Sequence, residues 1–245
     1  MQALKNAVKY ILQKTLGYQR YLFVFSKYKI NNLKSDKKEG DFFAFMNAIS
    51  GEEGVIMDVG ANIGIMTAHL SRKFPKAEIH CIEPVPTNLS VLNKIIAHFK
   101  LRNTKVFNVA VGEREEELEM VLPVHKKVKM QGLAHVVHDS IDEWNDGEKF
   151  KVKSTTIDQL EEGKTVLGIK MDIENFEYFA LKGATKILTN QTPVIYLELW
   201  ENENRDQCFD LLEGLGYQAF VVENDRLIPE KEASVKKQNF IFKKG

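Results

Sequence analysis

The sequence predicts an α/β domain in which helices cover both faces of a mostly parallel sheet. From about residue 53, short apolar runs alternate with segments of helical periodicity, the pattern of β-turn-α units. The first of these runs, "GVIMDVG" (54–60), leads straight into a glycine turn. A chain of 245 residues suffices for one such domain with a sizeable core, or for a domain with a short appendage.

Composition narrows the class of ligand and the compartment. The 34 Lys and Arg residues balance the 34 Asp and Glu residues, so we expect a small discrete ligand and no nucleic acid. Cys81 and Cys208 lack metal spacing and are expected to be free, reduced thiols. Apolar runs are shorter than the roughly 18 residues of a transmembrane span, and the N-terminus lacks a signal-peptide pattern. We therefore expect a cytoplasmic protein without a transmembrane segment.

The elements of the first half follow from periodicity and from breaker residues. Residues 1–50 have apolar residues at mixed helical spacing, which predicts a helical N-terminal lead-in ahead of the main domain at 51–245. Three roles stay open for it: capping the domain, pairing two protomers in a homodimer, and contact with a membrane surface. The next elements, in order, are a strand at 54–60, a helix at 62–74 before Pro75, a strand at 77–84, a helix at 87–99 and a third strand at 105–113.

The alternation then breaks at residues 113–165, which we interpret as an insertion with extra strands near 117–124 and 149–157. Because long loops beside a rigid sheet often carry specificity, we expect this insertion to shape the acceptor pocket. Regular alternation resumes with a strand at 165–172, a helix to Gly183, a strand at 192–200, a helix through 207–216, and two closing strands at 217–224 and 239–244. The count predicts a sheet of seven strands.

The glycine turn "DVGANIG" combines with a later acid to suggest a ligand. Gly60 and Gly64 sit between a strand and a helix, where the backbone can approach a ligand closely. Their G-x-x-x-G spacing differs from the dinucleotide fingerprint, and Asp58 beside the turn would repel a pyrophosphate but suits an amino group. Glu83 ends the next strand, where an acid can accept both ribose hydroxyls. An amino-acid end and a ribose together describe S-adenosylmethionine.

Five motifs in order resemble one family. The motifs "VIMDVGANIG", "CIEPVPTNLSVLNKII", "NVAVGE", "TTIDQL" and "IKMDIENFEYFALKGA" are similar to those of the FkbM family of S-adenosylmethionine-dependent methyltransferases, over about residues 53–200. The resemblance implies a class I methyltransferase Rossmann-like fold, whose seven-stranded sheet has an antiparallel last strand. It also implies O-methylation of a hydroxyl on a sugar, a glycan or a polyketide-like small molecule.

The resemblance assigns cofactor residues to this chain. The turn from Asp58 through Asn62 to Gly64 would hold the amino-acid end of S-adenosyl-L-methionine, with Thr67 as an extra donor. Glu83, followed by Pro84, would hold the ribose. Asn108 at the end of the third strand would lie near the adenine, although related methyltransferases often carry an acid there.

Three acids follow the strand that ends in "KMD", and their roles differ. Ligands of such sheets bind at the carboxyl ends of the strands, so Asp172 should face the transferred methyl group and Glu174 should support it. Glu177 falls inside the helix, where an acid can simply complement the helix dipole. Asp172 could be the general base for an alcohol, or it could hold Mg²⁺ together with Glu198. Both chemistries remain open at this point.

Asn175 replaces the glycine of the family pattern D-x-E-G-x-E. Asn tolerates the left-handed conformation better than most residues, so we predict a positive φ at this position. The insertion contributes His125, His135 and His138, whose spacing is a weak metal signal. We interpret them as loop residues, with His135 or His138 as a reserve base.

The sequence thus predicts a cytoplasmic, S-adenosylmethionine-dependent O-methyltransferase acting on a small-molecule or glycan acceptor. Two alternatives are an NAD-linked oxidoreductase, which the absence of G-x-G-x-x-G disfavours, and a scaffold that binds the cofactor without catalysis.

Overall fold

The central sheet of the computed structural model has eight strands, and the structure describes residues 12–36, 39–125, 128–138 and 144–244. The strands lie in the order β12-β11-β13-β10-β9-β1-β2-β3. Their bounds are β1 Val55–Val59, β2 Glu78–Ile82, β3 Thr104–Phe107, β9 Val166–Met171, β10 Val194–Glu198, β11 Gln218–Glu223, β12 Arg226–Pro229 and β13 Asn239–Lys243.

The strand directions confirm the predicted topology. β1 pairs in parallel with both β2 and β9, β2 pairs with β3, and β9 pairs with β10. The last strand, β13, is inserted antiparallel between β10 and β11. The eighth strand, β12, is an addition that the seven-strand prediction missed. It folds back on β11 through Asn224 and Asp225, whose φ values of 51° and 61° make the left-handed turn that a tight hairpin requires.

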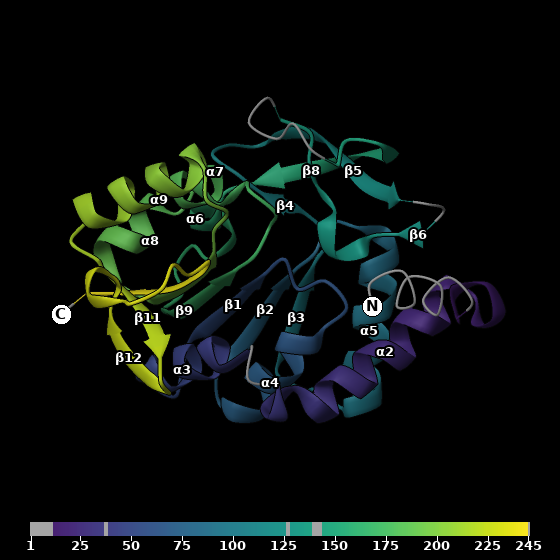
Figure 1. Ribbon diagram of the computed structural model, residues 1–245, viewed down its shortest axis with the longest axis horizontal. Coiled ribbons are helices and arrows are strands. Elements are labelled where there is room, and N and C mark those ends of the chain that lie inside the picture. Colours follow the sequence, from purple (N-terminus) through teal and green to yellow (C-terminus); the bar gives the residue numbers. More distant parts are fainter. Residues whose placement is uncertain (1–11, 37–38, 126–127, 139–143, 245) are drawn as a thin grey trace.

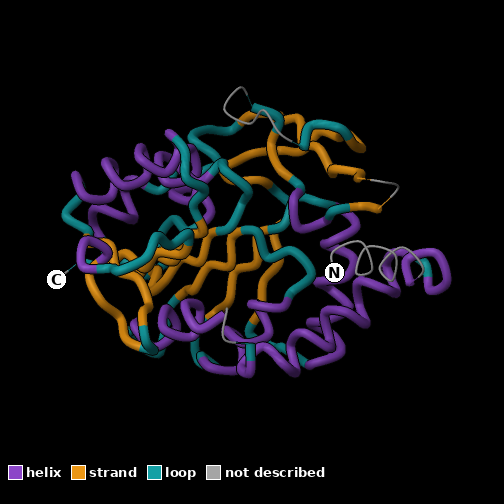
Figure 2. The backbone as a smooth tube through the Cα atoms, in the orientation of Figure 1, coloured by secondary structure: helices purple, strands orange, loops and turns teal. Residues whose placement is uncertain are grey.

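Helices cover both faces of this sheet (Figures 1 and 2). One face carries the helices from the first half of the chain: α2 Tyr18–Asn32, the short η1 Leu33–Ser35, α3 Gly40–Ala48, α4 Ile65–Lys73 and α5 Pro86–Phe99. The other face carries α6 Ile157–Leu160, α7 Glu177–Lys182, α8 Thr185–Asn190 and α9 Glu203–Gly214. No helix of the described residues is both long enough and apolar enough to cross a bilayer.

Alternation along the strands divides the core between the two helical layers. Met57 and Val59 of β1 pack into the cluster with α7 to α9, whereas Ile56 packs with α3 and α4. Because successive side chains point to opposite faces, Asp58 shares the face of Ile56 and lies under α4. Lys170 of β9 pairs with Asp58 in register, which places two charged residues side by side in the sheet.

The insertion forms a second, smaller sheet above the first. It consists of β4 Ala110–Val111, β5 Glu116–His125, β6 Val128–Lys129, β7 His135–Val136 and β8 Gly147–Thr155, with the short η3 Gln131–Leu133 before β7. The long antiparallel pair of β5 and β8 confirms the strands expected near 117–124 and 149–157. The prediction of one continuous strand at 105–113 was wrong, because this segment forms two strands, β3 and β4. The chain leaves the main sheet at Phe107, and β4 pairs instead with β8 of the second sheet.

Candidate active site

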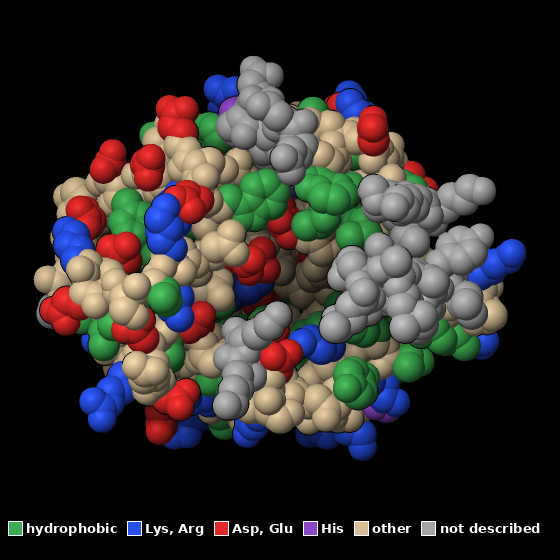
Figure 3. All heavy atoms as spheres, in the orientation of Figure 1, with side chains coloured by type: hydrophobic (Ala, Val, Ile, Leu, Met, Phe, Trp, Pro, Cys, Tyr) green, Lys and Arg blue, Asp and Glu red, His purple; other side chains and the backbone are tan. Residues whose placement is uncertain are grey.

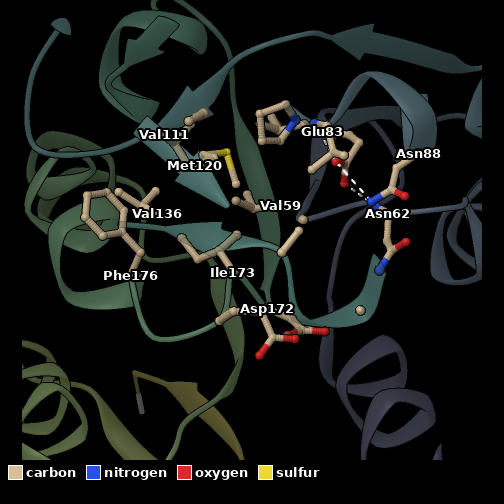
Figure 4. A pocket seen from close by; sticks show the side chains of 18 residues that line it. Val59, Asn62, Glu83, Asn88, Val111, Met120, Val136, Asp172, Ile173 and Phe176 are labelled. Atoms are coloured by element: carbon tan, nitrogen blue, oxygen red, sulfur yellow. Dashed lines mark hydrogen bonds between the residues drawn. The ribbon is translucent and has the colours of Figure 1, made fainter. Parts of the chain in front are cut away.

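A pocket of about 570 Å³ opens at the carboxyl ends of β1, β2 and β9. Figure 3 shows a hollow in the middle of the molecule with acidic side chains at its floor. The lining combines a polar edge with an apolar wall, and the insertion supplies part of that wall (Figure 4). The lining residues used below are Gly60, Asn62, Glu83, Pro84, Val85, Asn88, Val111, Met120, Ala134, Val136, Asp172, Ile173, Glu174 and Phe176.

Glu83 anchors the polar edge of this pocket. Its side chain is only 3 % exposed, and its two oxygens accept hydrogen bonds from the backbone N–H of Asn62 at 2.7 Å and of Val85 at 2.8 Å. The side-chain amide of Asn88 also donates to it, at 3.4 Å. Burial raises the pKa of Glu83 to about 7, although these donors oppose the shift. The acid therefore ties the end of β2 to the glycine turn after β1.

The turn itself is held in left-handed backbone conformations. Gly60 has φ 74°, and a Cβ at this position would lie 2.0 Å from the backbone oxygen of Asp172. Asn62 has φ 50° and lines the pocket beside Gly60. Gly64, with φ 80°, has a different role. A Cβ at this position would lie 2.8 Å from Leu92 Cδ1 of α5, so the glycine leaves room for that side chain. Gly60 and Asn62 thus reach the pocket, whereas Gly64 serves helix packing.

Asp58 and Thr67 lie beneath the turn, outside the pocket lining. Both are fully buried, and the Thr67 hydroxyl donates to Asp58 Oδ2 at 2.6 Å. Lys170 Nζ lies 3.4 Å from Asp58 Oδ1 and donates to the Gly60 carbonyl at 3.1 Å. Burial alone would lower the pKa of Lys170, but Asp58 and then Asp172 outweigh it and raise the pKa above its ordinary value. The structure therefore gives Asp58 and Thr67 a supporting place under the turn, in contact with Lys170.

Sequence reasoning missed two site residues, Asn88 and Lys170. The Lys170 side chain is 5 % exposed, and its Nζ also lies 3.8 Å from Asp172 Oδ2. A lysine inside an apolar strand is rarely buried without a partner, and that anomaly in "VLGIKMD" was the available signal. Lys170 and Asp172 are alternate residues and share one face with Asp58. The lysine thus joins the glycine turn to the acidic end of β9.

Glu174 after β9 and Glu198 at the end of β10 both have a raised pKa. Burial, followed by the charges of Asp172 and Glu198, raises the pKa of Glu174 to about 9. Burial and then Asp172 raise the pKa of Glu198 to about 7, with Lys170 opposing the shift. Asp172 and Glu174 line the pocket, whereas Glu198 is only half-buried and does not belong to its lining. The raised pKa of Glu174 favours its neutral form, which limits the negative charge around Asp172.

Glu177 has a structural role that exceeds dipole compensation. It is 1 % exposed, and its carboxylate accepts from the backbone N–H of Ile173 at 2.9 Å and from the Asn204 side chain at 3.3 Å. Burial raises its pKa to about 7. These bonds tie the loop after Asp172 to α7 and α9, so Glu177 fixes the direction in which that loop leaves the strand.

Asn175 has φ 75°, which confirms the predicted left-handed conformation. Its neighbour Glu174 has φ 56°, so two successive residues of this loop are left-handed. Asn175 is 2 % exposed, and its Oδ1 accepts from Asn202 Nδ2 at 2.8 Å. Asn202 in turn caps α9, because its own side chain accepts from the Arg205 N–H at 3.3 Å. Asn175, which replaces the family glycine, therefore keeps the left-handed turn and adds a hydrogen bond to the N-cap residue of α9.

Replacing Asn175 by Gly and by Ala should separate these two contributions. Gly accepts the φ of 75° but loses the bond to Asn202, so we expect unfolding free energy to change by about 1 kcal/mol or less. Ala loses the bond and also strains the backbone, so we expect a loss of about 2 kcal/mol. Urea unfolding followed by circular dichroism measures both, with Asn93→Ala on the exposed side of α5 as the control. Equal losses for Gly and Ala would contradict the role of the left-handed conformation.

Two further candidates, Asn108 and His135, lie away from the pocket lining. Asn108 follows β3 and is exposed. His135 is 1 % exposed, and its ring nitrogens contact the Leu133 carbonyl at 2.8 Å and Asn145 Oδ1 at 3.2 Å. Its neighbours Ala134 and Val136 line the pocket, and strand alternation turns His135 away. The structure therefore does not bring His135 to the place a reserve base would need.

The other two histidines of the insertion differ in what can be said of them. The His138 ring lies 4.7 Å from that of Phe179 and 6.1 Å from that of Phe176, so it borders the apolar wall. The side chain of His125 lies outside the described residues.

A magnesium site at Asp172 and Glu198 gains no support. Within the part of the chain that the structure describes, no group of three or more His, Cys, Asp and Glu side chains is arranged to hold a metal ion. The ammonium of Lys170 is a cation beside Asp172, and it also opposes the rise in the pKa of Glu198. Lysine thus supplies the positive charge that the metal hypothesis assigned to Mg²⁺.

The strand order with its antiparallel insertion of β13, together with a glycine turn, a Glu after β2 and an Asp after β9, defines a class I methyltransferase fold. The chain belongs to the FkbM methyltransferase family, since the family described as "Methyltransferase FkbM domain" matches residues 58–225.

Two known proteins illustrate the relationship. The chain is 25% identical over 188 residues to "Methyltransferase sdnD" of Sordaria araneosa, a match that covers 66% of this chain and 73% of that protein. The crystal structure of methyltransferase FkbM from Methylobacillus flagellatus is similar with a TM-score of 0.55 and 17% identity. That match covers 80% of this chain and 45% of the other, so this chain spans less than half of that larger structure.

The pocket has unsatisfied polar atoms that suit the cofactor of this fold class, S-adenosylmethionine. Among the described residues, Asn62 Oδ1 and Asn88 Oδ1 are buried without a hydrogen-bond partner, and both residues line the pocket. They lie next to Glu83, and the apolar wall with Val111 lies across the pocket from them (Figure 4). Buried polar atoms without partners are costly, so this edge is suited to a ligand rich in donors. A ribose and an adenine offer such donors.

Proposed function

We propose that the protein transfers a methyl group from S-adenosylmethionine to a hydroxyl of a small-molecule or glycan acceptor, with Asp172 as the general base. The observation that carries the proposal is the place of Asp172, which lines two pockets at once. One pocket contains Glu83, and a second of about 580 Å³ lies between the glycine turn and α2. Gly60 and Asn62 also line both pockets. An acid at this junction can reach an acceptor beside a cofactor held by the turn.

Positioning supplies much of the rate of such a transfer, since the acceptor oxygen must lie in line with the methyl carbon. The cofactor would supply the activated methyl group, and Glu83, Asn62 and Asn88 would hold its nucleoside. Lys170 and Glu177 would fix the strand end and the loop around Asp172. Asp172 would then accept the proton that the hydroxyl loses.

We also propose that the insertion contributes to the acceptor site. Met120, Ala134 and Val136 of the insertion line the pocket together with Phe176 and Ile173 from the loop after Asp172. This wall is apolar, which favours an acceptor with an apolar body next to its hydroxyl. The match to a family of methyltransferases disfavours the alternative of an NAD-linked oxidoreductase.

Incubation with methyl-labelled S-adenosylmethionine and a panel of glycans, hydroxylated metabolites and cell extract tests the proposal. We expect labelled product from the native protein and a loss of about 10²- to 10⁴-fold in turnover for Asp172→Asn, with cofactor affinity nearly unchanged. Asp210→Asn on the exposed side of α9 is the matched control. Cofactor binding without transfer to any acceptor would favour the non-catalytic scaffold, and full turnover of Asp172→Asn would remove the base from the mechanism.

A further inference from the structure

The charges of this neutral chain are strongly segregated along its sequence. Residues 1–35, 59–77 and 84–112 together contain fourteen Lys and Arg and no Asp or Glu. These segments include all of α2, α4 and α5, which contact one another on one side of the sheet. Figure 1 shows the three helices together in the lower part of the molecule. The fold therefore brings together three helices, from separate parts of the chain, that carry basic residues and no acidic ones.

Several cations of this face lack an acidic partner. Lys29 and Lys76 are paired with carboxylates, at Asp36 and Glu52 respectively. By contrast, no carboxylate of the described residues lies within ion-pair distance of Arg20, Lys34, Arg72 or Lys94. The neighbouring Lys34 and Arg72 also help to lower the pKa of His69, after burial, to about 4. The positive charge of these four side chains is therefore uncompensated and would attract an anionic partner.

Exposed apolar side chains lie within the same face. Seven large hydrophobic residues of the described chain are exposed, and four of them fall between residues 12 and 28. On α2, Val24 is 55 % exposed and Tyr28 is 64 % exposed. They follow Arg20 at intervals of four residues, so the three lie on one side of the helix, with Lys27 beside them. Figure 3 shows hydrophobic and basic side chains together along the lower right edge, over α2.

We infer that the face formed by α2, α4 and α5, centred on Arg20, Val24, Lys27 and Tyr28, docks onto the surface of an anionic lipid membrane. Lipid headgroups carry the negative charge that these cations lack, and the region beneath them accepts Val24 and the Tyr28 ring. A second copy of the chain would bring two basic faces together, which repulsion disfavours. A nucleic acid backbone would satisfy the cations but would leave Val24 in water. Charge and exposed apolar surface together therefore favour lipid.

The neighbouring side of α2 reaches the cofactor turn. Phe25 and Lys29 line the second pocket together with Gly60 and Asp172. On this helix Val24 and Tyr28 are exposed at the surface. The residues that directly follow them, Phe25 and Lys29, line the pocket. A membrane bound to α2 would lie next to a wall of the site. The docking inference itself does not depend on the transfer reaction, since lipid binding is measured without substrate or cofactor.

Vesicle flotation with the full chain tests the inference. Vesicles of phosphatidylcholine alone are compared with vesicles that contain phosphatidylglycerol as well, in low and high salt. We expect binding to the anionic vesicles only, and weaker binding as salt rises. Arg20→Glu combined with Lys27→Glu, and separately Val24→Ser combined with Tyr28→Ser, should each weaken binding by about tenfold or more. Circular dichroism checks that each variant is folded.

Matched controls lie on the far edge of the sheet and beyond it. Arg226→Glu combined with Lys231→Glu makes the same change in charge, and Val235→Ser changes a side chain that is 54 % exposed. Both controls should bind vesicles like the native protein. The inference is overturned if the native protein ignores anionic vesicles at low salt, or if the control variants lose as much binding as the α2 variants. Tighter binding to a duplex oligonucleotide than to anionic vesicles, with the Val24 and Tyr28 pair irrelevant, would also overturn it.

Discussion

Replacing Glu83 by Gln is expected to weaken the binding of S-adenosylmethionine by about 100-fold. The side chain keeps its size, but one of its two oxygens becomes an NH₂ group. Both native oxygens accept backbone N–H groups, from Asn62 and from Val85, so the amide must face one of these donors with a donor of its own. The change also removes a charged acceptor for the ribose, and bonds to charged groups contribute about 1.5–3 kcal/mol each. Titration calorimetry measures the loss directly.

The pH dependence of the same titration isolates Glu83. Burial raises its pKa to about 7 in the free protein, and the carboxylate is the form that accepts ribose hydroxyls. Affinity should therefore be full above pH 7 and fall as the pH drops below it, by up to about tenfold per pH unit. The amide introduced by Glu83→Gln cannot titrate, so this variant should lack that component while keeping any titration of the ligand. Identical pH profiles for the two proteins would contradict the assignment, and Glu232→Gln, an exposed acid, serves as the control.

The main sheet could be predicted from the sequence because apolar residues recur with different periods in strands and in helices. Apolar runs such as the one before Gly60 are buried on both faces, and their strong local signal placed β1, β2, β9 and β10 within a few residues of the observed bounds. The strand at 105–113 failed for a nonlocal reason. Its second part pairs with Ser154 and Thr155, more than forty residues later, and no local pattern records that partner. The hairpin at Asn224 and Asp225 was missed although its turn residues were a usable signal.

The site was predictable to the extent that it follows the ends of strands. Glu83, Gly60 and Asp172 were placed by that rule, and all three line the pocket. The positions of the Lys170 and His135 side chains could not be predicted in the same way. Their contacts depend on how the strands pair and on which face of a strand each side chain lies. Lys170 meets Asp58 only because β9 pairs with β1 at that residue, and His135 points away only because its neighbours Ala134 and Val136 face the pocket. Sequence spacing alone fixes neither of these orientations.

Replacing Lys170 by Met is expected to give the largest loss of stability of any change at the site, about 3–5 kcal/mol. The ammonium is buried and is the partner of Asp58, which is fully buried itself, so the variant leaves an uncompensated carboxylate in the core. Met fills a similar volume, which separates the loss of charge from the loss of packing. Urea unfolding at neutral pH gives the free energy of unfolding.

A double-mutant cycle decides whether the loss belongs to this pair. Asp58→Asn keeps an oxygen for the Thr67 hydroxyl and removes the stranded charge, so Lys170→Met with Asp58→Asn should lose clearly less than the two single changes together. The matched cycle of Lys170→Met with Asp172→Asn should show weaker coupling, because that distance is 3.8 Å and the Asp172 side chain is 36% exposed. Additive losses in the first cycle would mean that Lys170 stabilises the turn through the Gly60 carbonyl alone. Coupling confined to Asp58 would establish that Lys170 stabilises Asp58 beneath the glycine turn directly. Its effect on Asp172 at the pocket would then be indirect.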